Sequence, residues 1–203
     1  MTSSFQYFSL NRTIILKKIL LAIFILTSIV GFSQQKIIKI LNSSVTTADE
    51  KKYPGAIILG GDVIISHAGA ILTCRRAYYY PKKNFFKASI NVVINQGDTI
   101  RQTSDYVDYD GNLKKAVSWG NVILKDPSMT LTTDTLYFNR EKQELFYKDH
   151  GTIRDETNTL KSKNGTYFLE NKKFTATTRV TIDNPDNLIE SDRLDYYTNF
   201  GHA

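Results

Sequence analysis

Leu131-Thr-Thr-Asp134-Thr-Leu136-Tyr-Phe138 decides the fold, because variants of this stretch recur along the chain. Four other copies keep its pattern and end in an aromatic residue at the same place. The five closing aromatics are Tyr79, Tyr109, Phe138, Tyr167 and Tyr196, spaced by 30, 29, 29 and 29 residues. Self-similarity at a nearly fixed period predicts a repeat architecture, in which stacked units bury a shared core. Gln102 and Gly165 are the poorest matches to the pattern.

Each copy of the motif predicts a strand with a corner in its middle. Leu131 and Thr133 keep the two-residue period of one strand face, and so do Leu136 and Phe138. The step between the two pairs is three residues, so the second pair would face the other way unless a bulge or bend intervened. The expected corners lie near Arg75, Asp105, Asp134, Lys163 and Asp192. A small hydroxyl or thiol side chain precedes each corner and can bond nearby backbone groups.

Turn-rich, charged stretches follow the first four aromatics and predict hairpin loops. These loops are expected at 81–84, 110–112, 139–142 and 170–173. Return strands are expected around Val92 and Ile94, Val122 and Leu124, Ile153, and Val180 and Ile182. No stretch after residue 53 has a convincing helical stripe. The sequence therefore predicts an all-β, antiparallel, repeat-built jelly roll, folded into a V with apolar side chains in its crease.

The first 33 residues have the features of a secretory signal peptide. Basic residues at 12, 17 and 18 lead into an apolar run at 19–30, and Gly31 and Ser33 suit cleavage before Gln34. The apolar run is much shorter than the roughly 20 residues that span a bilayer, which favours cleavage over anchoring. We therefore expect the chain to be exported to the periplasm.

The expected domain organisation has three parts: a signal peptide at 1–33, a leading strand and loop at 34–60, and the repeat domain at 61–203. Within the second part, 36–41 reads as a strand and 42–52 as a polar loop or arm. The chain stops just past the fifth aromatic, before that repeat has a second half. Either a strand edge is open for pairing there, or the sequence is a fragment of a longer protein.

The charge balance does not favour a nucleic-acid partner. The chain carries 26 Lys and Arg against 20 Asp and Glu, a net charge of +6. Removal of 1–33 takes away three basic residues and no acidic one, which leaves 23 against 20, or +3. That excess is too small for a nucleic-acid-binding surface. The single cysteine, Cys74, cannot form an internal disulfide, so packing must hold the fold.

Residues suited to catalysis are scarce, so we expect neither an enzyme nor a bound cofactor. His67, His150 and His202 have no partner at metal-ligand spacing. Asp105, Asp108 and Asp110 resemble a calcium loop, but Tyr106 and Val117 occupy ligand positions, which favours a hairpin turn. Asp134 and Asp192 could form an acid pair across stacked repeats, although corner residues that bond backbone amides are the simpler interpretation.

A set of apolar residues is expected to face into the crease. The set comprises Val63, Ile65, Leu72, Val92, Ile94, Val107, Val122, Leu124, Leu131, Leu136 and Phe138. If the crease is closed, these side chains form an ordinary core. If it is open, they form a groove for lipid.

The repeats resemble the OstA-like family of lipopolysaccharide-transport proteins over roughly residues 36–200. The resemblance is carried by Gly-Asp62-Val-Ile-Ile with Leu72-Thr-Cys-Arg-Arg-Ala77-Tyr-Tyr, by Gly120-Asn-Val-Ile-Leu with Leu131 to Phe138, and by Ile189-Glu-Ser-Asp192-Arg-Leu-Asp-Tyr-Tyr. It implies a periplasmic protein of outer-membrane assembly whose β groove shields the acyl chains of lipopolysaccharide. It also implies edge-to-edge pairing with copies of itself or with other transport proteins.

Three functions remain open from the sequence. In the first, the groove carries lipid, and lysines such as Lys82, Lys83, Lys114 and Lys115 meet phosphates at its mouth. In the second, the protein is a scaffold that joins envelope proteins through strand edges and binds no lipid. In the third, it is an enzyme that acts on polysaccharide through paired acids.

Overall fold

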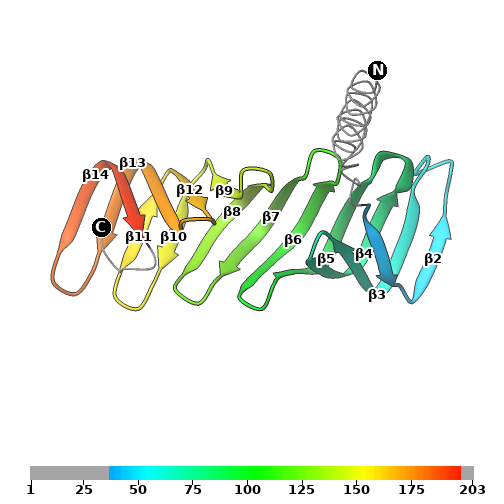
Figure 1. Ribbon diagram of the computed structural model, residues 1–203, viewed down its shortest axis with the longest axis horizontal. Helices are drawn as coiled ribbons and strands as arrows, with labels where there is room; N and C mark the ends of the chain where they lie inside the picture. Colours follow the sequence, from blue (N-terminus) through cyan, green and yellow to red (C-terminus); the bar gives the residue numbers. More distant parts are fainter. Residues whose placement is uncertain (1–36, 198–203) are drawn as a thin grey trace, which may run out of the picture. The chain divides into compact units, whose positions relative to one another are not determined.

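The computed structural model describes residues 37–197, which form one antiparallel sheet of 14 strands (Figure 1). The strands are β1 (Lys39–Asn42), β2 (Val45–Ala48), β3 (Ile57–His67), β4 (Ala70–Tyr80), β5 (Phe85–Gln96), β6 (Ile100–Asp110), β7 (Lys115–Lys125), β8 (Thr130–Asn139), β9 (Glu144–Tyr147), β10 (Gly151–Arg154), β11 (Thr159–Ser162), β12 (Asn164–Phe168), β13 (Lys173–Asp183) and β14 (Leu188–Tyr197). A 3-10 turn, η1 (Pro81–Lys83), lies between β4 and β5. The predicted all-β antiparallel fold is confirmed, with hairpins that follow one another in chain order.

Two predictions concern residues outside the described part of the chain. The signal peptide at 1–33 is one, and the role of His202 is the other. Within residues 37–197, no helix has the length and apolar character needed to cross a membrane.

The predicted corners are confirmed by the pairing of the strands. Between β4 and β5 the register jumps from Thr73 to Arg76, and the same jump recurs in the later strand pairs. Leu72 and Tyr79 lie on opposite sides of this corner, yet both are buried. Both halves of each long strand therefore face the same crease. In each motif the half-strand after the corner carries the closing aromatic. These halves, with the return-strand halves paired to them, are called arm A. The half-strands before the corners, with the return-strand halves paired to them, are called arm B.

The return strands bend at pairs of left-handed residues, and these bends were not predicted from the sequence. The pairs are Gly61 and Asp62, Ile90 and Asn91, Gly120 and Asn121, and Thr178 and Arg179, all with positive φ. These pairs lie inside β3, β5, β7 and β13, so β3 begins at Ile57, before the expected domain boundary at 61. At Gly120 a Cβ would lie 2.5 Å from Asp105 Oδ2, which leaves room only for glycine.

Four of the five small side chains before the corners bond the backbone as expected, and Ser104 is the exception. Ser162 Oγ donates to the carbonyl of Asn164 at 2.9 Å, and Ser191 Oγ donates to that of Arg193 at 2.7 Å. Cys74 Sγ lies 3.3 Å from the carbonyl of Arg76. Burial raises the pKa of the Cys74 thiol to about 11, so this residue is a small packed side chain.

The segment before the repeats contains more strand than the sequence suggested. β1 falls close to the expected strand, but β2 lies inside the expected loop, so the loop prediction is wrong there. β1 pairs with Ile64–Ser66 and β2 pairs with Ile57–Gly60. The physical reason is that β3 is bent, and each of its two halves needs its own partner strand.

Gly165, a poor match to the motif, is explained by the aromatic residues that surround it. A Cβ at this position would lie 2.3 Å from Phe174 Cζ and 2.5 Å from the Tyr147 ring. Tyr147 is 1% exposed, and its hydroxyl lies 2.6 Å from Ser162 Oγ. The ring of Tyr147 thus occupies the space that a side chain at position 165 fills in the other repeats.

Two clusters of buried side chains fill the crease. One runs from Ile38 to Ala116, and the other runs from Val122 to Tyr196. Phe138 is only partly buried and packs against both clusters. Buried side chains therefore close the crease over most of its length, and the packing is looser around Phe138, where the two clusters meet.

Candidate functional site

Tyrosine hydroxyls tie the two arms together across the crease. Tyr167 in arm A donates to Asp126 Oδ2, at the end of arm B, over 2.8 Å. Tyr196 bonds Asp155 in the same way, one repeat further on. The Tyr109 hydroxyl lies 2.6 Å from His67 Nδ1, and the Tyr79 hydroxyl donates to the carbonyl of Ile38 at 3.3 Å. Each of these contacts joins residues 41 or 42 positions apart.

The third repeat lacks this tie because its closing aromatic is phenylalanine. Phe138 has no hydroxyl, so it cannot bond the end of arm B as its counterparts do. Arg140 lies two residues further on, and its Nη2 donates to the carbonyl of Ala68 at the end of arm B. Between the contacts made by Tyr109 and Tyr167, the mouth of the crease therefore has this guanidinium contact in place of a tyrosine hydroxyl.

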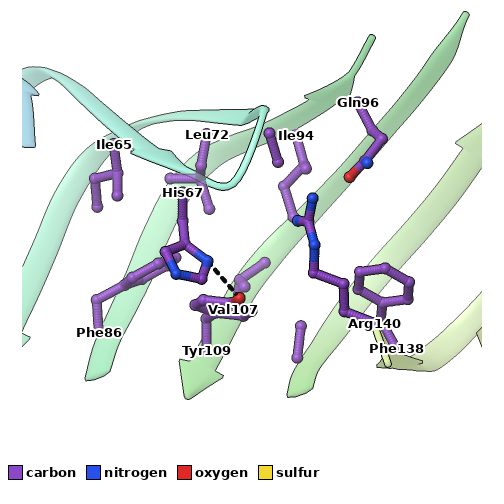
Figure 2. Close-up of a pocket in the computed structure, with 12 residues that line it drawn as sticks. Ile65, His67, Leu72, Phe86, Ile94, Gln96, Val107, Tyr109, Phe138 and Arg140 are labelled. Atoms are coloured by element: carbon purple, nitrogen blue, oxygen red, sulfur yellow. Dashed lines mark hydrogen bonds between the residues drawn. The ribbon is translucent and has the colours of Figure 1, made fainter. Parts of the chain in front are cut away.

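An apolar cavity lies at this repeat (Figure 2). Its volume is ≈ 60 Å³, room for a small number of water molecules, so a larger ligand could enter only if the arms moved apart. A second hollow of ≈ 50 Å³ adjoins it and shares Ile94, Gln96, Ala116 and Phe138 with it. Figure 2 shows Ile94, Phe138, Gln96 and Arg140 around the same space, opposite the bonded pair His67 and Tyr109.

The cavity exists because Ala116 is small. The residues at the same place in the other repeats are Ile57, Phe86, Leu145 and Phe174. Phe86, Leu145 and Phe174 are buried and fill the crease of their repeats. Ala116 pairs with Phe138 across β7 and β8, so the smallest side chain of this series faces the aromatic that lacks a hydroxyl. The small residue that leaves the crease incompletely filled and the phenylalanine that lacks the hydroxyl therefore lie in one layer.

The eleven residues expected in the crease all belong to its inner face, but only some of them border the cavity. Ile65, Leu72, Ile94, Val107, Leu124 and Phe138 line one or both hollows. Val63, Val92, Val122, Leu131 and Leu136 are at most 1% exposed and belong to the closed core. Their assignment as lipid-binding residues stays a prediction.

Sequence reasoning missed the residues that distinguish this cavity. Ala116, Gln96 and Arg140 line it and were not singled out. Alignment of the return strands would have identified Ala116 as the small member of a large-residue series. The contact between Arg140 and Ala68 joins residues 72 positions apart, so no local sequence pattern predicts it.

The ends of the two arms carry opposite charge. The loops that end arm A carry Lys82, Lys83, Lys114, Arg140, Lys142 and Lys172, offset by Glu141 and Glu170. The loops that end arm B carry Asp98, Asp126, Asp155, Glu156 and Asp186. The lysines expected at the mouth lie at the end of arm A and are exposed, and Lys114 pairs with Glu141 at 3.0 Å. An anionic group at the mouth would meet its counter-charges on arm A.

The acidic residues considered for metal binding or catalysis lie in a hairpin turn or at the corners of strands. Asp110 Oδ1 accepts hydrogen bonds of 2.9 Å from the amides of Asn112 and Leu113, which confirms the hairpin turn. Asp134 and Asp192 are both exposed at corners, and β10, β11 and β13 lie between their strands in the sheet. These two carboxylates are not brought together as a pair.

The contact between Tyr196 and Asp155 predicts a pH dependence of stability. Burial opposes ionisation of Asp155, but bonds from Tyr196 and from the amides of Thr157 and Asn158 outweigh it and lower the pKa of the carboxyl. The stabilisation is present above the ordinary pKa of aspartate, about 3.9, and is lost as the pH falls through the lower folded-state value.

We expect Asp155→Asn to flatten the acid side of a plot of unfolding free energy against pH, measured by urea denaturation. Asp98→Asn, which alters an exposed loop carboxylate, is the control and should leave the slope unchanged. Equal slopes for the protein and Asp155→Asn would contradict this account of the contact.

The bent sheet and the unfilled layer of its crease define a class of protein, the repeat-built β-jelly roll with an internal apolar cavity. The family model described as OstA-like protein matches residues 34–192, which is most of the chain. The chain belongs to the OstA-like family.

A solved structure with a similar chain is LptH from Pseudomonas aeruginosa, described as the LptA homologous periplasmic component of the lipopolysaccharide transport device. The match has 12% sequence identity and a TM-score of 0.33, and covers 74% of this chain and 96% of that one. No curated protein matches the sequence.

Proposed function

We propose that the protein is a periplasmic carrier that binds lipopolysaccharide, holds an acyl chain in the cavity between Ala116 and Phe138, and catalyses no reaction. One observation carries the proposal. In its other repeats the crease is filled and its arms are joined by a tyrosine hydroxyl, but this layer is incompletely filled and has no such hydroxyl contact. Membership of the OstA-like family supports it, because the resemblance seen in the sequence implies lipopolysaccharide transport.

Burial of hydrocarbon supplies enough free energy for binding without a covalent step. Each buried methylene contributes about 0.8 kcal/mol, so a chain of about a dozen methylenes gains on the order of 10 kcal/mol before the costs of association. An acyl chain that enters at Phe138 would have to displace the contact between Arg140 and the Ala68 carbonyl, whereas the tyrosine hydroxyl contacts lie in the neighbouring repeats.

The head group of the ligand would stay at the mouth of the crease. Exposed Lys82 and Lys83 at the end of arm A present point charges to phosphate groups. The acidic end of arm B would repel the same groups, so the ligand is expected to lie with its phosphates over arm A.

Competition for a fluorescent fatty acid tests the proposal. We expect the purified protein to bind the probe with an enhancement of fluorescence, and lipopolysaccharide to displace it. Phosphorylated sugar without acyl chains is the control and should not displace the probe. A protein that binds neither the probe nor lipopolysaccharide would contradict the proposal.

A scaffold that joins partners through strand edges is the second candidate, and the exposed edge at β14 favours it. Among the described residues, β14 pairs only with β13, and Leu188, Ile189 and Tyr197 on it are exposed. In this alternative, proline substitutions in β14 would abolish function, whereas changes to the cavity would not. The two candidates are thus separated by which set of variants loses activity.

A further inference from the structure

We infer that the cavity selects acyl chains that carry a hydroxyl group along their length, an inference that rests on the proposed function. The first observation is a polar pair in the wall of the second hollow. Gln102 is 7% exposed, and its Nε2 donates to Ser118 Oγ over 2.6 Å. The corresponding residues in the other copies of the motif are Leu72, Leu131, Leu160 and Ile189. The amide thus replaces an aliphatic side chain in the repeat that borders the cavity.

The second observation is a buried hydroxyl group that lacks a partner. Ser104 lies on the same face of β6 as Gln102, two residues closer to the corner, behind the residues that line the two hollows. Its Oγ is buried and has no hydrogen-bond partner among the described residues. The residues at this place in the other copies, Cys74, Thr133, Ser162 and Ser191, all bond the carbonyl two residues further on. Ser104 alone among the five does not make that bond.

Buried polar groups without partners are rare in native proteins, because each costs the free energy of its lost contact with water. Among the described residues, the side chain of Gln102 makes a single hydrogen bond, although an amide can make up to four. The wall therefore holds unused hydrogen-bonding capacity beside the apolar side chains of Ile94, Leu124 and Leu145. A ligand that completes this site is apolar over most of its length and polar at one point.

A hydroxyl group on an acyl chain has the required chemistry. It can donate to the amide oxygen of Gln102 and accept from its nitrogen or from the hydroxyl of Ser118, which also lines the second hollow. An unsubstituted chain in the same place would exclude water from these groups and form no hydrogen bond with them. Sites built to bond a hydroxyl reject the analogue that lacks it, which makes the polar pair a determinant of specificity.

The test compares tetradecanoate with analogues that carry one hydroxyl group, either on the third carbon or near the methyl end. Each competes for the fluorescent fatty acid on the purified protein. We expect one of the hydroxylated chains to bind about five-fold more tightly than the unsubstituted chain, the ratio given by one hydrogen bond of about 1 kcal/mol.

Gln102→Leu is the informative variant, because leucine occupies this place in three other copies and should preserve the fold. We expect it to remove the preference for the hydroxylated chain and to keep or strengthen binding of the unsubstituted chain. Thr103→Leu, on the next residue and the opposite face of β6, should leave the preference intact.

The outcomes separate this inference from the proposed function. If all the chains bind equally, or if Gln102→Leu keeps the preference, the inference is overturned and the carrier function stands. If no chain binds at all, both are overturned.

Discussion

Ala116→Phe is expected to weaken lipid uptake by at least about ten-fold while leaving the fold intact. Phenylalanine occupies the same place in two other repeats, at Phe86 and Phe174, where it fills the crease. In the third repeat it would occupy the cavity that the proposed ligand needs. Loss of only two buried methylenes costs about 1.6 kcal/mol, so affinity for the fluorescent fatty acid should fall by at least about ten-fold.

The control for this change is Val117→Phe. Val117 is the next residue on β7 and pairs with Asp108 and Tyr137 on the face that points away from the crease. We expect its affinity for the probe to equal that of the unmodified protein, and the melting temperature of Ala116→Phe to be unchanged or higher. Undiminished binding by a folded Ala116→Phe variant would rule out this cavity as the lipid site.

Gly165→Ala is expected to cause the largest loss of stability. The new Cβ would meet ring carbons of Phe174 and Tyr147 at 2.3–2.5 Å, and both rings are almost completely buried. Overpacking of a rigid core costs about 3 kcal/mol or more, because neither ring has space to move into. For a domain of this size the melting temperature should fall by about 10 °C in a thermal scan.

The matched control is Gly60→Ala, also in a strand. A Cβ at Gly60 would lie 3.7 Å from Val45 Cβ, an ordinary contact, so the melting temperature should barely change. A double variant, Gly165→Ala with Tyr147→Leu, should be less destabilised than the sum of its two single changes. Equal melting temperatures for Gly165→Ala and Gly60→Ala would show that the rings are not packed as described.

The repeat motif predicted the fold because the residue spacing that requires each corner lies within a single short stretch of sequence. The step of three residues between Leu131–Thr133 and Leu136–Phe138 required a corner, and the strands bend there. The bends in the return strands were not recognised, since Ile90 and Thr178 are residues that rarely adopt positive φ and give no turn signal.

The site was less predictable because it depends on which layers of the crease are closed. Leu131 was expected in a lipid groove, but it is 1% exposed in the closed core. A charged substitution at Leu131 would therefore test folding rather than binding. The ties from Tyr109 and Tyr167 connect residues about 41 positions apart, and only the three-dimensional pairing of the arms shows that Phe138 lacks one.

Photo-crosslinking tests most directly whether lipid occupies the cavity between Ala116 and Phe138. A photoreactive residue at position 94 would line the cavity, and the same residue at position 93 would face away from it. After irradiation with lipopolysaccharide, mass spectrometry should detect a lipid adduct on the protein labelled at 94 and none on the protein labelled at 93. No adduct at 94, or equal adducts at both positions, would contradict the account.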